Sequence, residues 1–147
     1  MKPFKYKLQS VLKLREFEKK KIENQLSSVN FEIQKTKKKI EDILLSISDL
    51  QNKINKVGEN GFLDLSLIKY FPEFLIASEK EVENLKNYLN DQEKLREETL
   101  KSLDECMAKV KILEKDKEIK IDKYKFDQRK KENLELEDMQ IILRGRR

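Results

Sequence analysis

Apolar residues recur along the first part of this chain at alternating steps of four and three residues, a period typical of a coiled coil. From Ile22 onward, ten of eleven successive positions in this register are apolar, and Thr36 is the exception. A heptad seam of this length predicts an α-helix that buries one narrow stripe against a neighbouring helix. The apolar positions of the first seam are Ile22, Leu26, Val29, Ile33, Ile40, Ile43, Ile47, Leu50, Ile54 and Val57.

A second seam of the same kind begins at Ile68 and predicts a second long helix. Ten of its fourteen positions up to Leu113 are apolar, and a polar run at Gln92, Arg96 and Thr99 interrupts it. Polar residues at such positions often fix how two paired helices align, and they lower the stability of the pair. Its apolar positions are Ile68, Phe71, Leu75, Val82, Leu85, Leu89, Leu103, Cys106, Val110 and Leu113.

Gly58 and Gly61 lie between the two seams and predict a reversal of the chain, with Gly58 ending the first helix in the left-handed conformation. The fold class that we expect is therefore all-α, a long antiparallel two-helix coiled-coil hairpin. We expect this hairpin to be monomeric and to form a single domain over residues 1–147.

The seams also predict the bounds of the elements. We expect the first helix over about 8–57, the turn over about 58–64 and the second helix over about 65–142, with a kink or short break near Pro72 because proline cannot donate a helical hydrogen bond. Beyond Leu113 the second seam thins. In an antiparallel pairing, the start of the first helix lies opposite this point. Residues 114–142 should therefore extend past the first helix as a single helix.

Composition limits the chemistry that the chain can perform. Charged residues make up 41% of it, and it holds three glycines, two prolines, one cysteine and no histidine. So few turn residues do not suit a sheet fold, and the usual nucleophile–histidine pairs and zinc sites cannot be built. We expect no enzyme activity, no cofactor, no metal site and no small-molecule substrate.

Two further absences suggest where the protein works. No stretch approaches the roughly 20 apolar residues that span a membrane, and no apolar region follows the basic N-terminus as it would in a signal peptide. We therefore expect a cytoplasmic protein.

The net charge of +5 is concentrated near the two chain ends. Residues 1–21 carry eight basic and two acidic side chains, residues 22–113 carry 14 and 17, and residues 114–147 carry 11 and nine. Interleaved signs elsewhere are typical of a solvated helix face. Because no aromatic residues are spaced for base stacking, we expect no nucleic-acid partner.

Two groups of apolar residues exceed what the seams need. Beside the turn, Leu67, Tyr70, Phe74 and Ala77 form a second stripe, which could either plug the end of the hairpin or dock a partner. The second group could fray with the helix end, dock on a partner or, more weakly, bind a membrane surface. It consists of Leu134, Leu136, Met139, Ile141, Ile142 and Leu143.

Both chain ends resemble the flagellar export protein FliJ family. The stretch from Phe4 to Glu16 has the family's aromatic residue, basic-aromatic-basic run, leucines and Arg-Glu pair. The stretch from Lys131 to Asp138 is similar to the family's Lys-Glu-Gln-Lys-Glu-Leu-Asp-Glu pattern. It departs from that pattern at Asn133 and Leu134 and in the order of the last two acids.

The resemblance implies a component of the bacterial flagellar type III export apparatus, similar in fold to the two-helix stalk of rotary ATPase γ subunits. It implies three partners: the hexameric export ATPase, whose assembly it would promote, the cytoplasmic domain of the export gate, and export chaperones. The location implied is cytoplasmic, peripheral at the inner face of the membrane through that apparatus.

Contact residues follow from the resemblance as hypotheses. The export-gate contact would be Tyr70, Phe74 and Ala77. The ATPase contact would be formed by residues near both chain ends, namely Leu12, Arg15, Glu132, Asn133, Leu136, Glu137 and Asp138. Three alternatives stay open: the equivalent stalk of a virulence type III secretion system, a generic structural or adaptor coiled coil, and a nucleic-acid binder that uses its basic ends.

Overall fold

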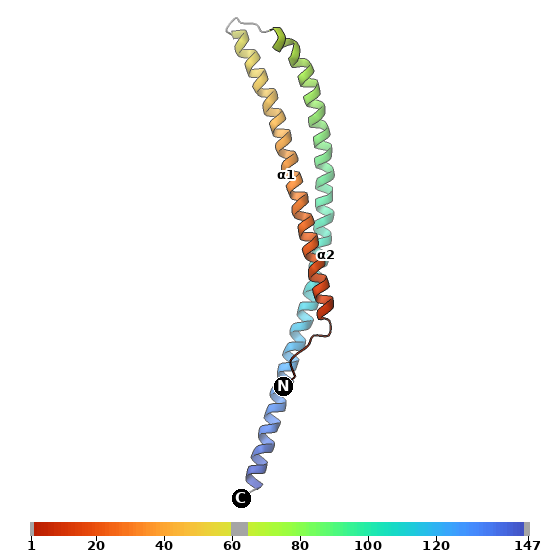
Figure 1. Ribbon diagram of the computed structural model, residues 1–147, viewed down its shortest axis with the longest axis vertical. Coiled ribbons are helices and arrows are strands. Elements are labelled where there is room, and N and C mark those ends of the chain that lie inside the picture. The colour runs from red at the N-terminus through yellow and green to blue at the C-terminus, as the bar shows by residue number, and fades with distance from the viewer. Residues whose placement is uncertain (1, 60–64, 146–147) are drawn as a thin grey trace. The chain divides into compact units, whose positions relative to one another are not determined.

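The computed structural model describes residues 2–59 and 65–145 of the chain, which form two long helices (Figure 1). α1 spans Gln9–Glu59 and has 51 residues, and α2 spans Leu65–Gly145 and has 81. The described residues include no β-strand. The two helices pack against each other, which confirms the predicted all-α helical hairpin.

α2 continues through Pro72 without the short break that the sequence allowed as one possibility. Proline has no N–H to donate to the carbonyl oxygen of Ile68, and one helical hydrogen bond is therefore missing. Phe71 and Leu75 on either side of it are half-buried seam residues. Their burial helps to hold this part of the chain helical in spite of the missing bond.

The predicted reversal falls mostly outside the described residues. Gly58 is the last residue but one of α1, which ends at Glu59, two residues later than predicted. Gly61 lies outside the described residues. A difference of one or two residues is usual where a helix frays at its end.

The chain divides into two compact units. The central unit comprises Ile22–Ser102, and the terminal unit comprises Met1–Lys21 together with Leu103–Arg147. Each helix therefore contributes one stretch to each unit.

The α1 stretch of the central unit turns its seam inward. Each seam position from Ile22 to Ile54 is buried or half-buried, and the least exposed are Val29, Ile33 and Thr36. The side chain of Val57 lies outside the described part of the chain. Burial of alternate third and fourth residues is the geometry that a heptad seam dictates.

The α2 stretch of the central unit follows its seam less evenly. Seam positions from Phe71 to Gln92 are buried or half-buried, and so is Thr99. Ile68 and Arg96 are exposed. The exposed Arg96 falls within the polar run of the second seam, where a long charged side chain keeps its head in water.

The terminal unit has a small core that draws on three separate stretches of chain. Tyr6, Leu12 and Val110 are buried against one another, and Phe4 and Leu113 pack on them. Two of these five residues precede α1, so the core is larger than two helices alone would make it.

Candidate functional site

Residues 2–8 form an N-terminal strap that lies along α2 within the terminal unit (Figure 1). The backbone N–H of Gln9 donates to the carbonyl oxygen of Tyr6 at 3.2 Å, and that of Leu12 donates to Leu8 at 2.9 Å. These two bonds join the strap to the start of α1. The strap thereby places its aromatic side chains against the other helix.

Tyr6 is the anchor of the strap. Its Oη donates a hydrogen bond to Asp116 Oδ2 at 2.6 Å. Lys120 Nζ lies 3.2 Å from the same carboxylate oxygen and 5.6 Å from the centre of the Tyr6 ring. One lysine thus neutralises the acceptor and also contacts the ring face of the donor.

The pKa values of this pair shift in the directions that the hydrogen bond requires. The bond to Asp116 raises the pKa of Tyr6 to about 12, and burial and the negative charge of Asp116 act in the same direction. The bond from Tyr6, followed by that from Lys120, lowers the pKa of Asp116 from its ordinary 3.8. A hydrogen bond to a charged acceptor favours the charged form of that acceptor.

Three further contacts hold the strap and the start of α1 against α2. The ring centres of Phe4 and Tyr124 lie 5.5 Å apart with the rings tilted by 53°, and Tyr124 Oη donates to the carbonyl oxygen of Lys2. Lys117 Nζ donates to Gln9 Oε1 at 2.8 Å. Contacts to the strap therefore reach Tyr124, beyond the point at Leu113 where the strong seam ends.

The predicted ATPase-contact residues near the N-terminus are only partly accessible. Leu12 is 3% exposed and belongs to the core. Arg15 is half-buried, and its Nη1 lies 3.1 Å from Glu18 Oε2. The thiol of Cys106 donates to the carbonyl oxygen of Arg15 at 3.5 Å, which places Arg15 beside this part of α2.

The predicted ATPase-contact residues near the C-terminus are Glu132, Asn133, Leu136, Glu137 and Asp138, and all five are exposed on α2. Helix rise alone separates Glu132 from Cys106, and hence from Arg15, by about 39 Å. The two predicted halves therefore do not meet in one compact site. They lie apart along the terminal unit.

The predicted export-gate residues share one face near the start of α2. The rings of Tyr70 and Phe74 stack with centres 5.7 Å apart and planes 26° apart. Tyr70 is 56% exposed, Phe74 is half-buried and Ala77 is exposed. The two stacked rings therefore form an aromatic surface that is partly open to solvent.

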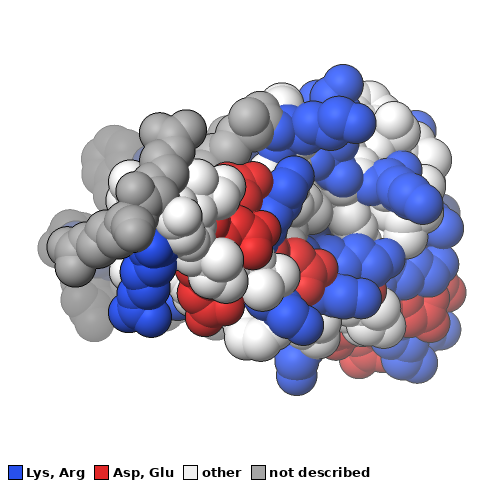
Figure 2. All heavy atoms as spheres, turned by 90° about the horizontal axis from the view of Figure 1, so that it is seen from below, with Lys and Arg blue, Asp and Glu red and all other residues white. Residues whose placement is uncertain are grey.

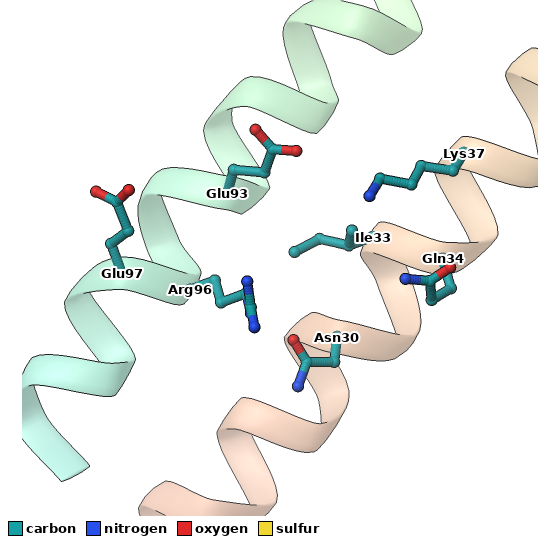
Figure 3. A pocket seen from close by; sticks show the side chains of 7 residues that line it. All are labelled: Asn30, Ile33, Gln34, Lys37, Glu93, Arg96 and Glu97. Carbon is teal, nitrogen blue, oxygen red and sulfur yellow. The ribbon is translucent and has the colours of Figure 1, made fainter. Parts of the chain in front are cut away.

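A polar gap separates the two helices in the central unit at the level of the polar run. The cavity has a volume of about 510 Å³, and Figure 3 shows Arg96 extending from α2 toward Asn30 of α1, with Lys37 and Glu93 nearby. Its other lining residues are Ile33, Gln34 and Glu97. Side chains of both charges line it, which favours no single class of charged ligand.

Several residues that matter to this geometry were not singled out by the sequence patterns. Tyr6 lies within the family-like stretch, and Asp116 and Lys120 lie beyond Leu113, where the second seam thins. Tyr124 falls on the register of the second seam after Leu113, and this position could have indicated that α2 still packs against another part of the chain there.

The surface of the molecule carries many charged side chains. Figure 2 shows basic and acidic side chains interleaved over one face. Among the described residues, no helix is long and apolar enough to cross a membrane. Within the same residues, no group of three or more His, Cys, Asp or Glu side chains is arranged to hold a metal ion.

Comparison with known proteins gives one match. The family model described as "Flagellar FliJ protein" matches residues 4–147. The match begins inside the strap and continues past the described end of α2. Neither the curated proteins nor the solved structures gave a match to this chain.

Proposed function

This chain belongs to the flagellar FliJ protein family and is a component of the flagellar export apparatus, and on that premise we propose that it acts as a non-enzymatic stalk. In this proposal the terminal unit binds the hexameric export ATPase and promotes its assembly. The aromatic face near the start of α2 binds the cytoplasmic domain of the export gate.

One observation supports the ATPase part of the proposal more than any other. From Arg129 to Gly145, every residue of α2 is exposed to solvent. A single amphipathic helix is marginal by itself in water. A helix of this length without a covering element suits insertion into a partner that surrounds it.

Acidic residues in this segment provide a direct test of ATPase binding. We expect Glu132→Lys with Asp138→Lys to lower affinity for the purified ATPase and to reduce its hexamer formation, as measured by sedimentation velocity. The matched control is Glu79→Lys with Glu81→Lys, two exposed acids of the central unit. Equal behaviour of the two double variants would remove the terminal unit from the ATPase contact.

The gate part of the proposal rests on the stacked rings of Tyr70 and Phe74. Aromatic side chains of this kind supply much of the binding energy in protein interfaces. We expect Tyr70→Ala with Phe74→Ala to weaken binding to the purified cytoplasmic domain of the gate by tenfold or more, an order of magnitude typical of interface anchors.

Tyr88→Ala is the control for the gate experiment, because Tyr88 is another exposed tyrosine of α2 in the central unit. It should leave gate binding unchanged. Gate affinity that is the same in the double variant and in the control would rule out the aromatic face as the gate contact.

Location and the remaining partner are part of the same proposal. We place the protein in the cytoplasm, held at the inner face of the membrane through the export apparatus, with export chaperones as a third partner. Cell fractionation should recover the chain with membranes when the apparatus is present and in the supernatant when it is deleted. Competition between a purified chaperone and the ATPase for this chain would test the escort role.

A further inference from the structure

A recess, here called the strap recess, lies between the N-terminal strap, the start of α1 and α2 in the terminal unit. Its volume is about 460 Å³, a size at which pockets in proteins hold ligands. Its walls are the aromatic side chains of Phe4 and Tyr6 and the polar side chains of Lys5, Gln9 and Lys117. Aromatic and basic groups therefore meet in one concave place.

Every charged residue that lines the strap recess is basic. Lys117 is half-buried, and its Nζ donates to the neutral Oε1 of Gln9 at 2.8 Å. Among residues 2–59 and 65–145, neither Lys117 nor Lys5 pairs with an acidic side chain, and the first turn of α1 contains no acid. A lysine ammonium group has three N–H donors, so two of those on Lys117 remain for a ligand.

The walls of the strap recess are held in place by contacts within the chain. Gln9 fixes the ammonium group of Lys117. Asp116, which precedes Lys117 in the chain, does not neutralise it, because its carboxylate accepts from Tyr6 Oη at 2.6 Å and lies 3.2 Å from Lys120 Nζ. The same bond fixes the Tyr6 ring. A ligand would thus meet groups that are already in position, which lowers the cost of binding.

We propose that the strap recess binds a carboxylate of a partner polypeptide, together with an apolar side chain next to that carboxylate. The carboxylate accepts hydrogen bonds from the ammonium groups of Lys5 and Lys117, and the apolar side chain lies against Phe4 and Tyr6. Hydrogen bonds between ionised groups are stronger than those between neutral groups. Charge complementarity therefore selects an acidic segment with a neighbouring apolar residue as the occupant.

The charges around the strap recess favour a narrow ligand over an extended anionic surface. Glu114 and Glu118 are exposed on α2, before and after Lys117 in the sequence. A membrane or a nucleic acid would bring many negative charges close to these carboxylates, and like charges repel. A single carboxylate that enters the recess meets the two lysines instead.

The experiment titrates the isotope-labelled full chain with the blocked peptide acetyl-Ser-Phe-Asp-Ser-amide and follows its amide chemical shifts by NMR spectroscopy. The signals of Lys5, Gln9 and Lys117 should shift together and give one dissociation constant. The same peptide with asparagine for aspartate should bind about tenfold more weakly, because the carboxylate is lost. Serine in place of phenylalanine should also weaken binding, since no ring then covers the aromatic wall.

Charge-removing variants with matched controls locate the site. Lys117→Gln should lower affinity for the aspartate peptide about tenfold, and Lys5→Gln, at an exposed position, about threefold. Lys7→Gln on the strap and Lys109→Gln on α2 remove the same charge at exposed positions outside the recess and should leave affinity nearly unchanged. Equal affinity of Lys117→Gln and Lys109→Gln would place the binding elsewhere.

Lys117→Arg separates loss of charge from damage to the strap. It keeps a positive donor at this position, so it should retain most of the affinity that Lys117→Gln loses. Circular dichroism and the amide shifts of Tyr6 without peptide check that each variant keeps its helices and its docked strap. A loss of affinity that arginine does not restore, in a chain that is otherwise unchanged, would contradict recognition by charge.

Three further results would overturn the proposal. Equal binding of the aspartate and asparagine peptides would show that no carboxylate is recognised. Acetate or inorganic phosphate that moves the same amides with the affinity of the peptide would assign the recess to a small free anion. Phosphatidylglycerol vesicles that bind the wild-type chain but not Lys117→Gln would assign it to a membrane surface. Neither the ATPase nor the gate is present in these measurements, so their outcome leaves those proposed contacts to their own tests.

Discussion

Tyr6 shows how one side chain can organise a stretch that has no secondary structure of its own. Its hydroxyl donates to Asp116, whose position in the sequence is 110 residues away. Lys120 sits beside both groups. A bond between a phenol and a charge-paired carboxylate is stronger than one between neutral groups. The strap is therefore held at a defined place on α2.

The pH dependence of strap docking follows from the two shifted pKa values. Tyr6 has a raised folded pKa, so its contribution is complete below its ordinary 10.0 and is lost as pH rises through about 12. Asp116 has a lowered folded pKa, so its contribution is complete above 3.8 and is lost as pH falls through the folded value. Docking should thus weaken at both extremes.

Asp116→Asn should bring the pKa of Tyr6 down from about 12 toward 10.0, because the negative acceptor is removed. Ultraviolet absorbance of tyrosinate measures this pKa, and Tyr6→Phe identifies which step in the titration belongs to Tyr6. Asp122→Asn, at an exposed position on the same helix, is the control. A Tyr6 step that stays at about 12 without the carboxylate would contradict the assigned cause.

Leu12 and Leu14 differ by two positions and should differ widely in their effect on stability. Leu12 is 3% exposed in the terminal core and Leu14 is 53% exposed. Leu12→Ala should cost about 2–4 kcal/mol in the free energy of unfolding, because it leaves a cavity. Leu14→Ala should cost less than about 0.5 kcal/mol. Urea denaturation followed by circular dichroism compares them, and similar costs would place Leu12 outside the core.

At the scale of the element, the seam tolerates three buried hydroxyl side chains. Thr36, Ser78 and Thr99 are each exposed by 9% or less. Thr36 Oγ1 donates to the carbonyl oxygen of Glu32 at 2.8 Å, and Thr99 Oγ1 donates to that of Leu95 at 2.7 Å. Each of these two hydroxyls thus finds a partner within its own helix. Bonds of this kind satisfy the polar group without attracting the opposite helix.

Thr36→Val should therefore stabilise the central unit by about 1 kcal/mol, since it replaces a buried hydroxyl with a methyl group of the same shape. The free energy of unfolding in urea measures the gain. Thr36→Ser, which keeps the hydroxyl and loses the methyl group, should lower stability instead. If valine lowers stability as serine does, the hydroxyl contributes more to the seam than its bond to Glu32 suggests.

At the scale of the whole molecule, the two ends of α2 have different kinds of neighbour. In the central unit α2 buries its seam together with the seam of α1. In the terminal unit it contacts α1 and the strap up to Tyr124, and beyond that residue it is almost entirely exposed. The exposed part presents charged and apolar side chains to solvent and contributes little to the fold.

Two truncations separate these contributions. Ending the chain after Tyr124 should leave the midpoint of urea denaturation nearly unchanged, because the residues removed are exposed. Ending it after Ile112 also removes Leu113, Asp116 and Tyr124, so the strap loses its partners. Limited proteolysis should then cut the strap as readily as a free terminus. Equal protection of the strap in both truncated chains would show that α1 alone holds it.

Local pattern was enough to predict two long helices that pack against each other, because a heptad repeat determines which face of a helix must leave water. It was also enough to point to the family. The same pattern did not predict that Leu12 is buried while Glu132 is exposed. It also did not predict that these two residues lie far apart in the terminal unit, because a sequence motif gives no distances in space.

The position of the strap against α2 could be found only from the folded structure. Phe4 and Tyr6 have no period, and nothing local pairs them with Tyr124 and Asp116, which only the antiparallel return of α2 brings near. Side-chain period along one helix is a property of the chain alone, and it determined the architecture. Contact between segments more than a hundred residues apart depends on how the helices register against each other, and that register settled which polar and aromatic groups meet.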